Sequence, residues 1–583
     1  MSNVHDGQNG RAIAIVAWLT RAAGVLAVLA AVLPGRRLLR SPVAEWLGLP
    51  PEVTLAAAAA MAVAGAGLVS LATGLRRRKR RAWQLAVLLT GAVTGLQLVL
   101  HHRYLPSLVP AALLLGLLVV LLANGDRFTA VPDPAIGRWY AIRVFVQFAA
   151  IGVAIDFVLL MVQSNRLVGT PPTGARLAHS VLALGGVTGP VRFTSLALDD
   201  LTAVVGLVFG VTAVVLGGYF LLRSAEPAPS MSAEDQQRLR ALLATQGGHD
   251  SLGYFALRSD KSVVFSPTGK AAVTYRTLAG VALSSGDPLG DPEAWPGAIT
   301  GFLDTCARFG WVPAVLGCST RGATVYNRHG LRVLELGDEA VVDVDQFTLH
   351  GRAMRDARKM VTRARKAGYR VDVRTVAELH PAEREMLAEL MERWRGSEPD
   401  RGYSMALGRA ADPRDADCVL VTASCEGQVR GLLQFVPWGP DGLSLDLMRR
   451  DRTSSDSGLN ELMIIELLES CAALGVRRVS LNFAVFRAAL ARGERIGAGP
   501  IDRMWARLLR LGSRWWQIES LYRFNAKFAP TWVPRYIAFP AGRELPRIVL
   551  AAMEAEGFGG RPRLLRSALS REPLDAVPEP VAS

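Results

Sequence analysis

The sequence predicts a multi-pass α-helical membrane domain followed by a cytosolic α/β domain. Six apolar segments of bilayer length lie within residues 1–223, and a Pro/Ser-rich linker at 224–240 follows them. Beyond the linker, helical and strand patterns alternate, and charged residues gather among apolar ones in 442–536. Because a buried charge is costly unless it is paired or used, this last stretch predicts a polar active site.

The membrane domain is predicted from apolar segments that each approach the roughly 20 residues needed to cross a bilayer. The run Arg76–Arg81 reads RRRKRR, and such basic loops usually lie on the cytoplasmic side. This orientation also places the N-terminus and everything after Arg223 in the cytoplasm. The basic group Arg36, Arg37 and Arg40 then falls outside, against the rule. The six segments are Ala12–Leu33, Val53–Leu75, Ala82–Leu100, Leu105–Ala123, Val144–Val162 and Leu201–Leu222.

Charge and cysteine content narrow the class of protein. Residues 1–230 hold 19 Lys/Arg and 9 Asp/Glu, so +10 of the total +15 belongs to the apolar half and only +5 to the remainder. This distribution favours membrane topology over nucleic-acid binding as the source of the basicity. The five cysteines lack metal-type spacing, which indicates reduced core thiols, no disulfide and no metal site.

Two ionisable residues fall inside predicted spans, Arg21 in the first and Asp156 in the fifth. Such residues indicate either a transport or lipid-handling role or a polar pair within the helix bundle. The loop over 163–200 is predicted to be external and polar, with a turn at Pro171–Gly174.

The first part of the soluble half, 241–393, is predicted as one α/β unit. Short strands are expected at Ser262–Phe265, Ala271–Tyr275, Gly280–Ser284, Trp311–Leu316 and Tyr369–Arg374, and an amphipathic helix at Pro296–Phe309. A basic helix over 352–370 places Arg355, Lys359 and Arg363 on one face. That face is either a solvated surface or a docking site for phosphates of RNA or anionic lipid.

The pattern of the second part, 394–560, predicts three consecutive antiparallel strands, a polar loop, a helix and a further strand. Residues 561–583 are predicted to form a flexible tail. The elements are Val419–Ala423, Val429–Pro437, Leu443–Arg449, the helix Leu459–Leu474 and the strand Val479–Phe483. This order is typical of a GNAT-like acyltransferase unit, and the first part has the shape of a weaker copy, so the soluble half is predicted to be a tandem. The stretch 449–458 holds a single glycine where acetyl-CoA-binding members carry a Gly-rich turn, which argues against acetyl-CoA as donor.

Membrane spans followed by this tandem resemble the phosphatidylglycerol lysyltransferases, the multiple peptide resistance factor family. The resemblance is strongest to the transferase half of lysylphosphatidylglycerol synthases fused to a lysyl-tRNA synthetase. It rests on the order of several motifs: DSLGYF (250–255), SSGDPLGDPEAWP (284–296), GYSMALGR (402–409), SLDLMRRDR (444–452), NELM (460–463), SLNFAVFR (480–487) and WWQIESLYRFNAKF (515–528).

The resemblance implies tRNA-dependent transfer of an amino acid, lysine by default, to a glycerol hydroxyl of phosphatidylglycerol in the inner leaflet of the cell membrane. The product is a cationic lipid that lowers susceptibility to cationic peptides. Aminoacyl-tRNA is then a co-substrate, no other cofactor is expected, and a homo-oligomer is left open. The sequence shows no synthetase part, so aminoacyl-tRNA would come from elsewhere, and six spans, fewer than in the flippase-synthases, leave lipid flipping in doubt.

The family pattern and the local spacing nominate the site residues. The family's Asp-x-x-Arg falls on Asp446 and Arg449: Asp446 would hold the aminoacyl ammonium or act as base, and Arg449 would hold a phosphate or stabilise an oxyanion. No Ser-His-Asp set or nucleophilic Cys is evident, which favours direct transfer without a covalent enzyme intermediate. The other candidates are Glu519 and Lys527 for catalysis, and Glu461, Asn482, Arg523, Arg535, Arg355, Lys359 and Arg363 for substrate binding.

Each nomination has a structural alternative. Glu519, Arg523 and Lys527 follow a spacing of four and so could form a chain of salt bridges on one helix face. Glu461 lies in the first turn of a predicted helix, where a carboxylate also stabilises the helix dipole. The competing classes are transfer to another lipid or a cell-wall acceptor, a lipid transporter or flippase with an inactive transferase domain, and a nucleic-acid-binding membrane protein.

Overall fold

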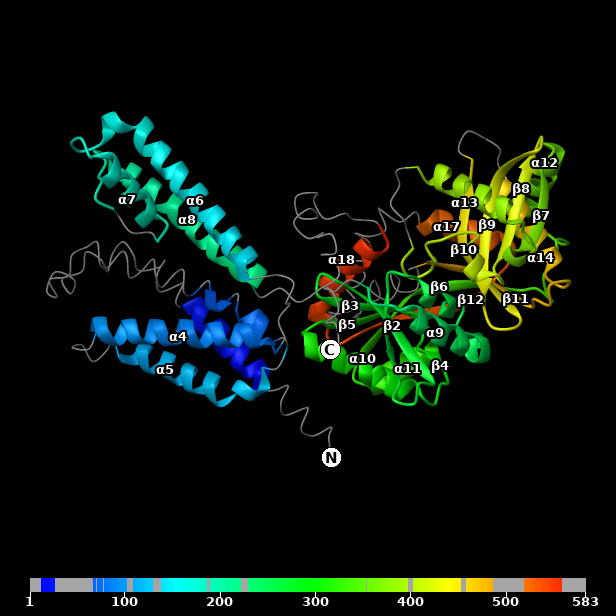
Figure 1. The fold of residues 1–583 in the computed structure, drawn as a ribbon, viewed down its shortest axis with the longest axis horizontal. Coiled ribbons are helices and arrows are strands. Elements are labelled where there is room, and N and C mark those ends of the chain that lie inside the picture. The colour runs from blue at the N-terminus through cyan, green and yellow to red at the C-terminus, as the bar shows by residue number, and fades with distance from the viewer. Residues whose placement is uncertain are drawn as a thin grey trace, which may run out of the picture. The chain divides into compact units, whose positions relative to one another are not determined.

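A computed structural model gives the fold of the chain, which divides near residue 226 into two units, each considered by itself (Figure 1). The structure describes residues 12–26, 65, 67–69, 71–76, 78–101, 108–128, 130, 138–185, 189–221, 229–352, 354–396, 402–451, 458–485 and 518–557.

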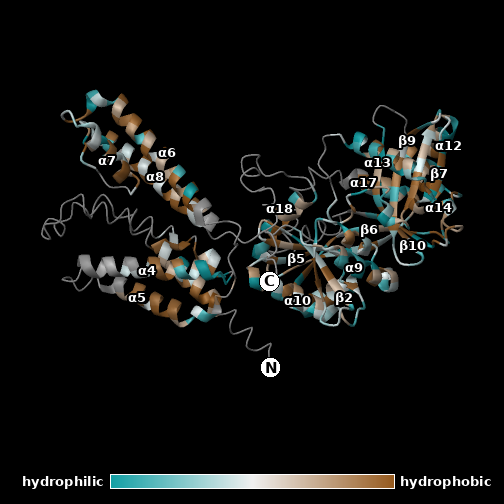
Figure 2. Cartoon of the chain, viewed as in Figure 1, coloured by the Kyte–Doolittle hydropathy of each residue, from teal (hydrophilic) through white to brown (hydrophobic). Residues whose placement is uncertain are grey.

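The N-terminal unit is helical where the apolar segments predicted it. Helices α4 (Arg80–His101), α5 (Leu108–Ala123), α6 (Arg138–Val162) and α8 (Leu196–Leu221) cover four of the predicted spans. Apolar residues run along most of α6 and α8 (Figure 2). Most of the second predicted span, over 53–64, lies outside the described residues.

Among the described residues, one helical segment, Ala141–Val162, is long and apolar enough to cross a membrane. Shorter apolar helices lie at Ala12–Leu26, Ala112–Ala123 and Thr202–Gly218. The six-span topology therefore stays a prediction.

The predicted polar loop over 163–200 contains a helix, α7 (Thr173–Ala183). Its inner face carries the buried residues His179 and Ser180, whereas Leu177 and Val181 on its outer face are exposed. The predicted turn at Pro171–Gly174 lies at the start of this helix, and Pro172 is its N-cap residue.

The C-terminal unit is built on one 12-stranded sheet with the order β1-β2-β3-β5-β12-β6-β11-β10-β9-β8-β7, and β4 pairs with β2. The strands are β1 (Ser262–Phe265), β2 (Ala271–Leu278), β3 (Val281–Ser285), β4 (Leu289–Gly290), β5 (Val312–Cys318), β6 (Arg332–Asp343), β7 (Arg370–Thr375), β8 (Val419–Cys425), β9 (Gln428–Pro437), β10 (Gly442–Arg450), β11 (Arg478–Val485) and β12 (Thr531–Phe539).

The same strand pattern occurs twice in this sheet. Antiparallel β1, β2 and β3 lead through helix α10 (Trp295–Phe309) to β5, which is parallel to β3. Antiparallel β8, β9 and β10 lead in the same way through α14 (Leu459–Ser470) to β11, which is parallel to β10. This repetition is the order predicted for a tandem of GNAT-like units.

The last strand of each half crosses into the other half. Strand β6 ends the first pattern but pairs with β11, and β12 ends the second pattern but pairs with β5. The two exchanged strands pair with each other along β12, which joins both halves into one sheet. The predicted boundary at 393/394 is therefore wrong in detail: β7, before it, pairs with β8, and β12, after it, pairs with β5.

Helices cover the sheet and close three apolar cores. Helices α12 (Arg355–Lys366) and α14 pack over the second half around Leu462, Ile465 and Phe435, while α18 (Leu545–Ala555) packs over β2 and β3. A third core lies under α9 (Ala233–Gln246) and α13 (Pro381–Arg395). The remaining helices of eight or more residues in the described part of this unit are α11 (Thr320–Arg328) and α17 (Ile518–Asn525).

A buried ion-pair network crosses the centre of the sheet. Arg535 on β12 donates to Asp250 Oδ1 at 2.6 Å and, through Nε and Nη2, to Glu339 Oε2 on β6 at 2.8 and 2.6 Å. Ser480 on β11 donates to Glu339 Oε1 at 2.5 Å. All of these side chains are buried, so the network fixes the exchanged strands at the place where the two halves meet.

We expect Arg535→Ala to destabilise the protein by about 3–5 kcal/mol, because it leaves two buried carboxylates without their cation. Arg477→Ala is the matched control, since the Arg477–Asp345 pair is exposed on both sides and should matter little. Thermal unfolding of the purified chain measures the difference. Equal midpoints for the two variants would contradict a central role for Arg535.

Candidate active site

The candidate site lies where β10 and β11 part. The two strands pair in parallel at Gly442–Arg478, Leu443–Val479 and Ser444–Ser480, and among their described residues the pairing ends there. On its other side β10 stays paired with β9, with a register shift between Leu445 and Leu447 that leaves Asp446 as the bulged residue. The sheet therefore opens beside Asp446.

Asn482 holds the backbone at the point of divergence. Its φ is +64°, a left-handed conformation that asparagine tolerates better than most residues. Its side-chain amide donates to the carbonyl of Leu445, and its backbone N–H donates to Ser480 Oγ at 3.1 Å. Asn482 thus connects β11 to the residue before Asp446 across the opening. Its hydrogen bond positions the part of β10 that carries Asp446.

Asp446 is buried and held by two donors. Leu407 N–H donates to Oδ1 at 2.7 Å, and Gln434 Nε2 donates to Oδ2 at 2.5 Å. Burial raises the pKa of the Asp446 carboxyl to about 7, although both hydrogen bonds act to lower it. A carboxyl with this pKa can take up or release a proton near neutral pH.

The segment 402–411, which contains the GYSMALGR motif, forms the wall behind Asp446. Arg258 donates to the carbonyl of Ala406 at 3.0 Å, and Arg409 pairs with Asp415 at 2.6 Å. Gln434 accepts from Ala411 N–H at 2.9 Å and donates to the carbonyl of Arg409 at 3.0 Å, so its amide ties this wall to Asp446. Sequence reasoning missed Gln434, and its one signal was a polar residue inside the apolar run of β9.

Glu461 and Lys527 form an ion pair of 2.6 Å between α14 and the short helix η8 (Ala526–Phe528). The structural alternative, a salt-bridge chain on one helix face, does not extend to Lys527, because α17 ends at Asn525 and Lys527 pairs with Glu461. Glu461 is nearly buried while Lys527 is partly exposed. The structure therefore joins two nominated residues that are 66 positions apart.

The other nominated residues lie at separate places. Arg449 is half-buried on β10, Arg523 lies on α17, and both side chains make interactions. Glu519 also lies on α17, but its side chain is outside the described part of the structure. Arg535 is 3% exposed inside the central network, so the expected contact with a lipid phosphate is corrected to an internal structural role.

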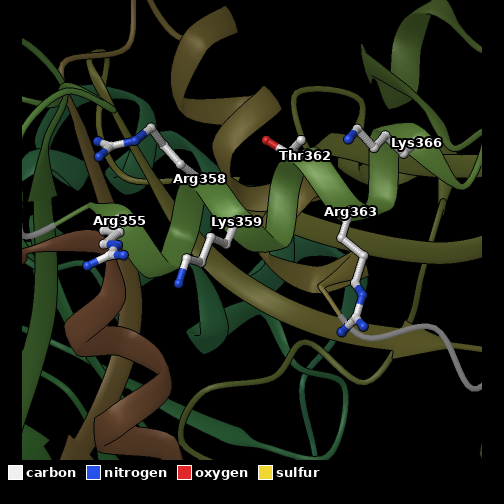
Figure 3. Close-up of a pocket in the computed structure, with 6 residues that line it drawn as sticks. All are labelled: Arg355, Arg358, Lys359, Thr362, Arg363 and Lys366. Atoms are coloured by element: carbon white, nitrogen blue, oxygen red, sulfur yellow. The ribbon is translucent and has the colours of Figure 1, made fainter.

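Helix α12 carries the nominated basic residues Arg355, Lys359 and Arg363. Together with Arg358, Thr362 and Lys366 they line a hollow of about 520 Å³ (Figure 3). The helix contacts both α14 and η8, the two elements that carry Glu461 and Lys527. Helix α12 therefore lies next to the two elements that carry the ion pair.

The described residues include no group of three or more His, Cys, Asp or Glu side chains placed to hold a metal ion. All five cysteines are free, and four of them are buried. Burial raises the pKa of the Cys471 thiol to about 12, which keeps it protonated and unreactive.

The comparisons with known proteins identify the family. The family model described as "Phosphatidylglycerol lysyltransferase, C-terminal" matches residues 240–539. The "Lysylphosphatidylglycerol biosynthesis bifunctional protein LysX" of Rhodococcus opacus is 43% identical over 85% of this chain and 44% of its own length. The protein of the same name from Nocardia farcinica is 44% identical over 84% of this chain and 43% of its own length.

A solved structure, L-PGS from Bacillus licheniformis, covers 57% of this chain and 99% of its own, with 21% identity and a TM-score of 0.49. The family match shows that the chain belongs to the phosphatidylglycerol lysyltransferase C-terminal family. The chain spans less than half the length of the two LysX relatives.

The pKa of Asp446 predicts a stability signature. The folded carboxyl titrates at about 7 and the unfolded one at 3.8, so between these values the folded state holds an extra proton. Stability should therefore fall as pH rises toward 7, by at most ~1.4 kcal/mol per pH unit, and then level off. Asp446→Asn removes this titration. Unfolding of both proteins from pH 5 to 8 tests it, and parallel curves would refute the raised pKa.

Proposed function

We propose that the chain transfers an amino acid, with lysine as the first candidate, from aminoacyl-tRNA to a glycerol hydroxyl of phosphatidylglycerol. Membership of the phosphatidylglycerol lysyltransferase family supports this reaction, as do relatives whose names assign them to lysylphosphatidylglycerol biosynthesis. The single structural observation that carries the proposal is Asp446, a buried carboxyl with a pKa of about 7 beside the opening between β10 and β11.

The reaction is a transesterification. The lipid hydroxyl oxygen forms a bond to the aminoacyl carbon, and the ester bond from that carbon to the tRNA ribose oxygen breaks. The proton leaves the lipid hydroxyl and ends on the ribose oxygen, so no external oxidant or cofactor is needed. The protein has to accept and return one proton and to stabilise the negative charge of the tetrahedral intermediate.

Asp446 is the proposed proton carrier. Its pKa near 7 gives an ionised fraction that can accept the lipid proton and a protonated form that can pass it to the leaving ribose oxygen. The other role considered for Asp446 is to hold the aminoacyl ammonium, whose positive charge would itself favour the ionised carboxylate.

Arg449 is the proposed electrostatic partner. It lies three residues after Asp446 on β10, beyond the bulge and on the part of the strand that no longer pairs with β11. A guanidinium beside the reacting centre would stabilise the developing oxyanion or hold the phosphate of either substrate. Asn482, bonded to the Leu445 carbonyl, keeps this part of β10 in place.

The proposed setting is the cytoplasmic side of the cell membrane. The long apolar helix segment Ala141–Val162 and the three shorter apolar helices support a membrane-embedded N-terminal unit. The multi-pass arrangement with a cytoplasmic catalytic unit rests on the positive-inside pattern of the sequence. In that setting the tRNA comes from the cytoplasm and the lipid from the inner leaflet.

Expression in a host that lacks aminoacylated lipids tests the function directly. We expect a new ninhydrin-positive lipid with the mass of phosphatidylglycerol plus one amino acid, which also names the amino acid. Asp446→Asn should lower its formation by about 10²–10⁴-fold, because a general base contributes on that scale. Asp441→Asn, at a half-exposed carboxylate just before β10, is the control and should stay active.

Mass spectrometry of the whole lipid extract and of cell-wall fragments separates the alternatives. Aminoacylation of another lipid or of a peptide would move the proposal to that acceptor. A membrane-inserted protein that changes no acceptor would contradict a transferase and favour a transporter with an inactive soluble domain.

The Glu461–Lys527 pair gives a second test. If the pair only joins α14 to η8, the double reversal Glu461→Lys with Lys527→Glu should recover both stability and transfer. We expect it to recover stability but leave transfer at least about tenfold below the unchanged protein, because Lys527 would be replaced by a negative charge beside an anionic substrate. Full recovery of transfer would show that the pair is purely structural.

A further inference from the structure

Two rows of side chains point outward from α12. Arg355, Lys359 and Arg363 recur every four residues along one row, and Arg358, Thr362 and Lys366 along the next (Figure 3). Members of one row are about 6 Å apart along the helix axis, from a rise of about 1.5 Å per residue. The hollow that the two rows line therefore presents several cations at regular intervals.

Three of these cations have no acidic partner among the described residues. Arg365, on another side of the same helix, pairs with Glu466 at 2.8 Å and Glu469 at 3.5 Å. In contrast, the side chains of Arg355, Lys359 and Lys366 form no hydrogen bond or ion pair with any described residue. An array of exposed cations without acidic partners is a docking site for an anion with several charges.

The chemistry of the face favours a nucleic-acid backbone over a bilayer. A helix that lies on a membrane turns an apolar face toward the acyl chains. The apolar residues of α12, namely Ala357, Val361 and Ala364, are instead buried against the protein. The exposed face is charged and hollowed, which fits a protruding strand of phosphates.

The position of α12 supplies the reason for such a partner. The helix contacts η8 and α14, so a phosphate backbone bound along it would pass beside Lys527. We propose that Arg355, Lys359, Arg363 and Lys366 dock the phosphate backbone of the donor tRNA and so guide its aminoacyl end toward Asp446. This inference rests on the proposed function, because it names the surface that receives the donor.

Binding of deacylated tRNA to the full chain in detergent tests the surface without requiring transfer. The variant Arg355→Gln/Lys359→Gln/Lys366→Gln should bind about tenfold more weakly at low salt. Its slope of log K against log salt should be shallower by about 2, because each lost phosphate contact removes about 0.7–0.9. The charge-keeping variant Arg355→Lys/Lys359→Arg/Lys366→Arg should retain the slope of the unchanged protein.

Arg365→Gln is the matched control, since it removes one positive charge from the same helix at a site that is already paired. It should leave tRNA binding and its salt slope unchanged. An equal loss in Arg365→Gln and the triple variant would overturn the proposal, since it would reflect overall charge or helix stability. Circular dichroism of each variant checks that α12 remains folded.

Vesicles of phosphatidylglycerol and of phosphatidylcholine, offered to the same variants, test the other source of phosphate. If the triple variant loses binding to the anionic vesicles but keeps its tRNA slope, α12 is a lipid surface and the proposal is wrong. Lipid aminoacylation that persists at an unchanged donor KM in the triple variant would also overturn it, while leaving the proposed function intact. Specific tRNA binding through α12 without any lipid product would support the docking surface and contradict the proposed transfer to a lipid.

Discussion

The pairing of one guanidinium with two carboxylates holds the C-terminal unit together. Arg535 lies on β12, Glu339 on β6, and Asp250 precedes the first strand, so three distant parts of the chain meet at one buried charge centre. Because the two strands concerned are the ones exchanged between the halves, neither half is complete without this centre. This charge centre also positions β11, because β11 pairs with β6 and Ser480 donates to Glu339. Strand β10 is positioned in turn through the hydrogen bond from Asn482.

The sequence predicted most of the local elements but not their long-range arrangement. The strands now called β8, β9 and β10 were expected within two residues of their bounds, because alternating apolar residues and turns are local signals. Strands β6 and β12 were missed: β6 mixes acidic residues with apolar ones, and β12 contains Pro534, which usually argues against a central strand. Both segments form strands because they pair with strands that are distant in the sequence. A local sequence pattern does not reveal such pairing.

The candidate site shows the same division. Asp446 was nominated from its motif, and the structure shows it buried and hydrogen-bonded by Leu407 and Gln434. The spacing of Lys527 suggested a helix face, but an early helix end redirected it to Glu461, which local spacing cannot foresee. Arg535 was nominated for substrate binding, whereas its partners in the structure are the side chains of Asp250 and Glu339. Gln434 acts through a tertiary contact that only the fold creates.

The crossing of terminal strands limits how this molecule can move. Two lobes joined by a single connector can swing about a hinge, and many enzymes admit their substrates that way. Here the sheet runs unbroken through β5, β12, β6 and β11, so a swing would have to tear backbone hydrogen bonds in the middle of the sheet. The C-terminal unit should therefore resist bending between its halves, and the opening beside Asp446 should keep its shape unless the loops around it move.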